Sequence, residues 1–238
     1  AIGQVMRYAV ATGRAEYDPT ASLKGTIETY AVKHMPSVTD PKKVGALLRM
    51  FDAFDGTHTV HSALRLAPLL FARPGELRQM RWADLDMDAS LWLLDRGSMK
   101  MRRDHVVPLS AQAKAIIEGM RPFSGHLEYV FPNARDPKRP MSDAAVNAGM
   151  RRLGIDTQEE LTGHGFRAMA RTILRERLKF DAEIIECQLS HVKQGSLGGA
   201  YDRTQFLDDR IQMMQAWANY LDDLKAGGKV LRMPGAAA

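Results

Sequence analysis

Residues 163–178 read GHGFRAMARTILRERL, and this stretch has the two-faced pattern of an amphipathic α-helix. Its apolar residues recur at helical spacing: Phe166, Met169, Ala170 and Ile173. Arginines at four-residue intervals form a basic stripe beside that face: Arg167, Arg171 and Arg175. A cation in the first turn opposes the helix dipole, which makes sense if an anion binds there, where backbone N–H groups point outward. The simpler alternative is a solvated basic face.

Helical periodicity dominates the rest of the chain as well. Further helices are predicted over residues 40–54, 58–72, 110–120, 142–154, 181–189 and 206–224, and the first residues have the pattern of the end of a helix. Asp40 is the expected N-cap of its helix, with Pro41 as the first helical residue. Short strand-like pieces occupy residues 83–88, 90–95 and 104–110. The sequence therefore predicts a mainly α domain with a small antiparallel β-sheet, an α+β fold.

Composition is that of an ordinary soluble globular protein. The 238 residues are 45% hydrophobic and 26% charged. No stretch approaches the roughly 18 consecutive apolar residues of a membrane span, and the first residues lack the features of a signal peptide. The single cysteine, Cys187, excludes an internal disulfide and fits a reducing compartment, so we expect a cytoplasmic protein. Its apolar helical surroundings favour a buried structural thiol over a nucleophile.

The net charge of +5 admits an anionic partner, and its distribution is more informative than its size. Arginine and lysine cluster in RPGELRQMRW, DRGSMKMRR, NARDPKRP, GMRRLG and GHGFRAMARTILRERLK. Recurrent basic clusters within one domain are what contact with a phosphate backbone requires. Solvated helix faces explain the charge equally well, so charge alone leaves both interpretations open.

Four short segments contain the reactive residue types. Each has an ordinary alternative use: Arg73 as a surface arginine paired with Glu76 or Asp84, for example, and Lys100 as the tip of a charged hairpin. The candidates are Arg73 in FARPGEL, Lys100 in RGSMKMRRDHVVPLS, His164 and Arg167 in TGHGFRAMAR, and His191 and Tyr201 in LSHVKQGSLGGAYDRT.

Together these residue types suit attack on a phosphodiester. Two arginines can hold the non-bridging oxygens, where negative charge concentrates as the pentavalent state forms. A tyrosine can form a covalent intermediate if a base such as histidine takes its proton, and a lysine can protonate the departing alkoxide. The sequence has no carboxylate cluster at metal spacing and no zinc-like histidine spacing. Fixed cations without a metal or other cofactor are therefore the expected means of stabilisation.

RPGEL, HGFR, QLSH and AYDR, in that order, resemble the tyrosine recombinases, specifically phage-type or prophage integrases. The resemblance covers about residues 38–224 and includes MKMRRDHVVPLS and MMQAWANYLDDL. Each motif is weak by itself, whereas the ordered set is specific. The resemblance implies the tyrosine recombinase catalytic-domain fold and strand cleavage through a 3′-phosphotyrosyl link with a free 5′-hydroxyl, without any cofactor.

The resemblance also assigns roles to positions. Arg73 and Arg167 match the arginines that clamp the phosphate, Lys100 the general acid, and His164 the residue placed for general-base work. His191 matches the histidine that hydrogen-bonds the phosphate, and Tyr201 matches the nucleophile. Supporting positions are Glu76 behind the site and, as contacts to DNA, Arg102, Arg103 and Arg171.

Domain organisation and partners follow from the same resemblance. Residues 1–37 are expected to be the last helix of a core-binding domain with a linker, residues 38–224 the catalytic domain, and residues 225–238 a flexible tail. The expected partners are double-stranded attachment-site DNA and further copies of the chain, in a tetramer formed through an exchanged, mobile C-terminal helix, and no membrane.

Two other functions are compatible with these residues. A nicking enzyme similar to type IB topoisomerases would share the chemistry and act as a monomer. The long helix at residues 206–224, suited to docking on a neighbour, favours the recombinase instead. A DNA-binding regulator without catalysis is disfavoured because all six reactive positions are occupied.

Overall fold

The structure is a computed structural model that describes residues 2–23, 36–94, 105–190 and 206–227. It divides into unit 1, Ala1–His34, and unit 2, Met35–Ala238. Unit 1 contains α1 (Ile2–Ala11) and the 3-10 turn η1 (Ala21–Leu23), and α1 has no buried residue. Within the described ranges, no helix combines the length and the apolar content that crossing a bilayer requires.

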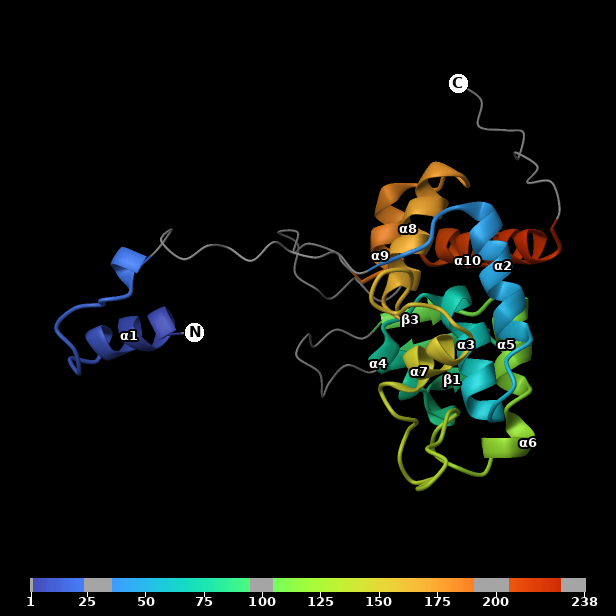
Figure 1. Ribbon diagram of the computed structural model, residues 1–238, viewed down its shortest axis with the longest axis horizontal. Helices are drawn as coiled ribbons and strands as arrows, with labels where there is room; N and C mark the ends of the chain where they lie inside the picture. Colours follow the sequence, from blue (N-terminus) through green and yellow to red (C-terminus); the bar gives the residue numbers. More distant parts are fainter. Residues whose placement is uncertain (1, 24–35, 95–104, 191–205, 228–238) are drawn as a thin grey trace. The chain divides into compact units, whose positions relative to one another are not determined.

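Unit 2 is mainly helical with a small sheet, as predicted (Figure 1). The order of its elements is α2 (Pro41–Asp52), α3 (His58–Leu70), α4 (Pro74–Arg78), η2 (Trp82–Asp84), β1 (Leu85–Asp86), β2 (Leu91–Leu94), β3 (His105–Pro108), α5 (Ala111–Glu118), α6 (Arg121–Ser124), α7 (Ala145–Arg152), α8 (Gly165–Glu176), α9 (Ala182–Gln188) and α10 (Leu207–Lys225). In Figure 1, α8, α9 and α10 gather at one end of this unit.

Local sequence signals place several of the helix ends. Asp40 caps α2, since its carboxylate accepts a hydrogen bond of 2.9 Å from the Lys43 N–H, and Pro41 is the first helical residue. This confirms the predicted start. α3 ends at Phe71, whose backbone is left-handed with φ 36°. α4, which was not predicted from the sequence, begins at Pro74, because proline fits the first position of a helix.

The sheet is antiparallel in the order β1-β2-β3, which confirms the three predicted strands, although each is shorter than its sequence pattern. Trp92 on β2 stands opposite Leu85 on β1 and Val107 on β3. Trp92 and Val107 are both buried, so this face of the sheet joins the core. The residues between β2 and β3, 95–104, lie outside the described ranges.

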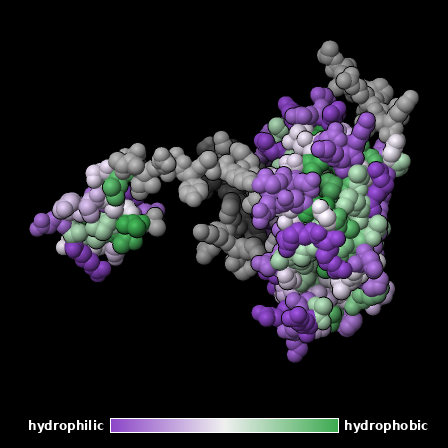
Figure 2. Space-filling model, in the orientation of Figure 1, coloured by the Kyte–Doolittle hydropathy of each residue, from purple (hydrophilic) through white to green (hydrophobic). Residues whose placement is uncertain are grey.

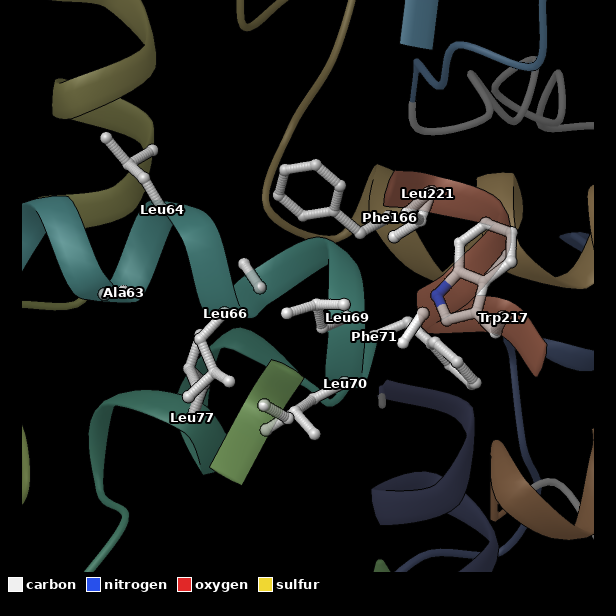
Figure 3. Close-up of a cluster of buried hydrophobic side chains, with 14 of the residues drawn as sticks. Ala63, Leu64, Leu66, Leu69, Leu70, Phe71, Leu77, Phe166, Trp217 and Leu221 are labelled. Atoms are coloured by element: carbon white, nitrogen blue, oxygen red, sulfur yellow. The ribbon is translucent and has the colours of Figure 1, made fainter. Parts of the chain in front are cut away.

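The core of unit 2 forms around the C-terminal half of α3 (Figure 3). Phe71 and Trp217 meet edge to face, with ring centroids 6.2 Å apart and planes at 87°. The Trp217 indole N–H also donates a 2.9 Å hydrogen bond to the Pro68 carbonyl. An aromatic pair with a satisfied indole binds two elements strongly, so α10 is fixed to α3 at this point.

α10 packs against its own unit along its whole length, including the neighbouring α2. The side chains that it buries are Arg210, Met213, Met214, Trp217, Ala218, Tyr220, Leu221 and Leu224. The resemblance to tyrosine recombinases implied a mobile helix that is exchanged between copies of the chain. Within the chain the apolar face of α10 is already covered, so exchange of the whole helix would first have to uncover it.

The surface of unit 2 exposes few large hydrophobic side chains among its described residues. The face shown in Figure 2 is largely hydrophilic, with smaller hydrophobic areas between. Among the described residues of unit 2, the exposed large hydrophobic side chains are Leu93, Phe123 and Ile211. They belong to three separate elements, and isolated residues of this kind are normal on a soluble domain.

The contact between α2 and α10 allows a stability prediction at Gly45. A Cβ atom there would lie 2.3 Å from the Leu224 carbonyl oxygen. Alanine usually stabilises a helix interior relative to glycine. A clash at this position would make the substitution destabilising instead. We expect Gly45→Ala to lower the free energy of unfolding by about 1–3 kcal/mol, measured by urea denaturation. Gly75→Ala is the control, since a Cβ there meets nothing within 4 Å. Equal stability of the two variants would contradict the close packing.

Candidate active site

Arg73 is held in place by a buried carboxylate. The Glu76 side chain accepts two hydrogen bonds from it, 3.0 Å from the Arg73 backbone N–H and 2.9 Å from Nη1 of its guanidinium. The Glu76 side chain is only 6% exposed, whereas that of Arg73 is 32% exposed. The pairing considered as an ordinary alternative is therefore real. Because the carboxylate is buried, it orients a guanidinium that still reaches the surface.

Arg167 is buried in the first turn of α8 and bridges two other helices. Its Nη1 donates to the Phe71 carbonyl at 3.1 Å, and its Nη2 donates to the Leu189 carbonyl at 2.6 Å. The first acceptor is at the end of α3 and the second at the end of α9. Phe71 is close to Arg73 in sequence, so this bridge brings the two predicted phosphate-binding arginines to neighbouring segments.

The basic stripe of arginines on α8 is not one solvated face. Arg167 is 5% exposed, whereas the side chain of Arg171 is 62% exposed. Nε of Arg171 pairs with the Glu186 carboxylate of α9 at 2.5 Å. Its predicted contact with DNA stays a prediction, and the structure gives it a protein partner in addition.

His164 is exposed at the N-terminal end of α8. The preceding Gly163 donates its N–H to Oδ1 of Asn147 at 2.9 Å. A Cβ atom on Gly163 would lie 3.4 Å from the ring of Pro74. The loop before α8 therefore lies against the start of α4, which places His164 on the same side of the unit as Arg73.

The end of α9 is tied to two elements just before His191. A ring nitrogen of His105, Nε2, lies 3.1 Å from the Gln188 carbonyl oxygen, and Arg167 holds the Leu189 carbonyl. The remaining predicted site residues lie outside the described ranges: Lys100, Arg102, Arg103, His191 and Tyr201. The elements on either side of them belong to unit 2.

Sequence reasoning missed Arg210, which is completely buried in α10. Its Nε donates to the Gln188 side-chain oxygen at 2.8 Å, and its Nη2 donates to the Val106 carbonyl. Burial lowers the pKa of its guanidinium, and nearby Cys187 opposes this effect in part. A sequence signal existed, because Arg210 precedes Met213, Met214 and Trp217 at the spacing of one helical face.

Cys187 is 4% exposed, in agreement with the predicted structural thiol. Among the described residues, no group of three or more histidine, cysteine, aspartate or glutamate side chains could hold a metal ion. The candidate site residues within the described ranges are Arg73, Glu76, His164, Arg167 and Arg171.

Comparison with known proteins identifies the fold and the family. The fold is that of tyrosine recombinase catalytic domains: a lambda integrase (75–356) dimer bound to a COC' core site has a TM-score of 0.59 at 15% identity, over 83% of this chain and 73% of that one. XerA recombinase has a TM-score of 0.53 at 16% identity, over 95% and 82%.

The sequence match is more specific than the likeness of fold. Residues 38–207 match the phage integrase family, and the chain belongs to that family. It is 37% identical to the integrase of Enterobacteria phage P4, over 92% of this chain and 52% of that protein. It is 36% identical to the putative protein IntB of Escherichia coli strain K12, over 92% and 58%. The chain thus spans about half the length of the curated relatives it matches.

The buried bridge of Arg167 allows a stability prediction with a matched control. Arg167→Met would leave two buried carbonyls without their donor, at about 1–3 kcal/mol each. We therefore expect it to lower the free energy of unfolding by about 2–5 kcal/mol. Arg171→Met removes an exposed ion pair on the same helix, worth about 0–1 kcal/mol. Chemical denaturation measures both, and coincident unfolding curves would show that Arg167 does not hold α3 and α9 together.

Proposed function

We propose that residues 38–224 form the catalytic domain of a site-specific DNA recombinase, a prophage integrase. Membership of the phage integrase family supports this proposal. The observation that carries it is the bridge from Arg167 to the Phe71 carbonyl, because it joins the segments of the two candidate phosphate-binding arginines. Fixed cations on adjacent rigid segments suit a transition state in which charge grows on phosphate oxygens.

The proposed reaction exchanges one phosphate ester for another. The Tyr201 phenol oxygen bonds to the phosphorus as the bond from phosphorus to the 5′ oxygen breaks. His164 takes the phenolic proton, and Lys100 protonates the departing 5′ oxygen. Arg73, Arg167 and His191 hold the non-bridging oxygens. Reversal with another strand's 5′-hydroxyl restores the backbone, so no metal or high-energy cofactor is required.

The described elements that flank the proposed catalytic residues in the chain support this assignment of roles. Lys100 lies between β2 and β3, while His191 and Tyr201 lie between α9 and α10. All four flanking elements belong to unit 2, and the end of α9 is joined to α8 by Arg167. Residues placed by rigid neighbouring elements can reach a geometry suited to in-line attack.

The proposed partners are double-stranded attachment-site DNA and three further copies of the protein. Solved structures with this fold include a lambda integrase dimer bound to a COC' core site and a tetramer bound to a Holliday junction. We propose DNA contacts for Arg102, Arg103 and Arg171. We propose that the copies meet through the C-terminal helix, by surfaces other than the apolar face that α10 already buries within the chain.

The nucleophile can be tested directly with Tyr201→Phe. The full-length protein is incubated with nicked duplexes tiled across the DNA that flanks its gene, and covalent adducts are resolved on a denaturing gel. We expect the wild type to be trapped on a duplex with the crossover sequence and Tyr201→Phe to give no adduct, because the nucleophilic oxygen is lost. Binding of the same duplex should be nearly unchanged.

Tyr220→Phe is the matched control. The Tyr220 hydroxyl is buried without a hydrogen-bond partner in the described structure, so its removal should leave folding and adduct formation intact. An adduct that persists in Tyr201→Phe would disprove the assignment of Tyr201 as the nucleophile. Loss of the adduct in Tyr220→Phe, with the adduct retained in Tyr201→Phe, would also disprove it.

A further inference from the structure

Arg210 occupies a position that stability alone does not explain. Its side chain is fully buried in the first turn of α10, where a cation opposes the helix dipole. Among the described residues, no carboxylate forms an ion pair with it. Burial of a charge without an opposite charge is unfavourable, and an apolar side chain of similar volume is often at least as stable.

The guanidinium joins three elements at one point. From α10 it donates to the Gln188 side chain at the end of α9 and to the Val106 carbonyl on β3. The Gln188 carbonyl is in turn 3.1 Å from Nε2 of His105 on β3. We call Arg210, Gln188, Val106 and His105 the arginine clamp. Arg210 makes these two contacts with two different nitrogens of its planar guanidinium, Nε and Nη2, whereas a lysine presents a single nitrogen.

The clamp lies where the chain leaves these elements for the proposed catalytic residues. Lys100 precedes β3, His191 follows α9, and Tyr201 precedes α10. Ser190 and Phe206, on either side of the His191 and Tyr201 segment, both have a left-handed φ of 54°. Such a backbone costs about 1–2 kcal/mol in a residue other than glycine and persists where surrounding contacts fix it. The Arg210 N–H itself bonds to the Phe206 carbonyl at 2.8 Å.

We propose that Arg210 is a positioning residue for strand cleavage, which sets the ends of β3, α9 and α10 relative to one another. The inference rests on the proposed recombinase function. Arg210 does not touch the phosphate in this account. It acts through the segments that lead to Lys100, His191 and Tyr201, so its loss should slow the chemical step and leave DNA affinity unchanged.

The test separates positioning from stability with a double variant. In Arg210→Met with Gln188→Leu, both side chains of this pair become apolar, which should restore the part of the stability that each single change removes by leaving the other side chain unpaired. The control is Trp217→Phe, which removes the indole bond to Pro68 from the same helix. Arg210→Lys keeps the charge without the fork. For each full-length protein we would measure the urea midpoint, duplex affinity by fluorescence anisotropy, and single-turnover adduct formation at saturating protein.

We expect the double variant to cleave about 10- to 100-fold more slowly than wild type, since misplacement by about 1 Å can have that effect. Its affinity should match wild type, and its midpoint should be no lower than that of Trp217→Phe. Trp217→Phe should cleave at nearly the wild-type rate, and Arg210→Lys should rescue little. Equal cleavage by the double variant and Trp217→Phe would overturn the proposal.

A separate readout distinguishes failure of the recombinase function itself. If wild type forms no adduct on any duplex, amide hydrogen exchange without DNA still tests the clamp. The double variant should then speed exchange in His105–Pro108 and Ala182–Gln188 well beyond the effect of Trp217→Phe. Faster exchange confined to α10 would contradict the inference that the arginine clamp joins β3 and α9 to α10.

Discussion

The proposed site depends on one buried contact, the Arg167 guanidinium held between the Phe71 and Leu189 carbonyls. This contact joins the ends of α3 and α9 through the first turn of α8. Arg73 follows the end of α3, where the buried Glu76 carboxylate orients it, and His191 follows the end of α9. A guanidinium suits this role because its donors are fixed in one plane and its charge persists at any working pH.

A second buried arginine makes the same kind of bridge at the end of α9. Arg210, in the first turn of α10, holds the Gln188 side chain and the Val106 carbonyl much as Arg167 holds its two carbonyls. Both arginines accept an unfavourable position in the helix dipole, and both bind neighbouring residues of α9. Since α10 also packs its apolar face on α2 and α3, the segment that contains Tyr201 leads into a helix anchored within its own unit.

Much of this fold follows from local sequence signals, whereas the site depends on contacts that those signals do not contain. Asp40, the helical periods and the three strands were predictable because caps and periodicity act within a few residues. The short helix α4 was not predicted, because its five residues are too few to show a helical period. The hydrogen-bond acceptors of Arg167 and Arg210 were not predictable, because they belong to distant elements and most of them are main-chain carbonyls, which every residue has.

The central claim is that Arg73 and Arg167 face one shared anion site. The most direct measurement is a crystal structure of the full-length protein with tungstate, which imitates a phosphate group and is located by anomalous diffraction. The account predicts one tungstate within hydrogen-bond distance of both guanidinium groups, beside His164. Guanidinium groups that point away from each other, with tungstate bound elsewhere, would contradict it.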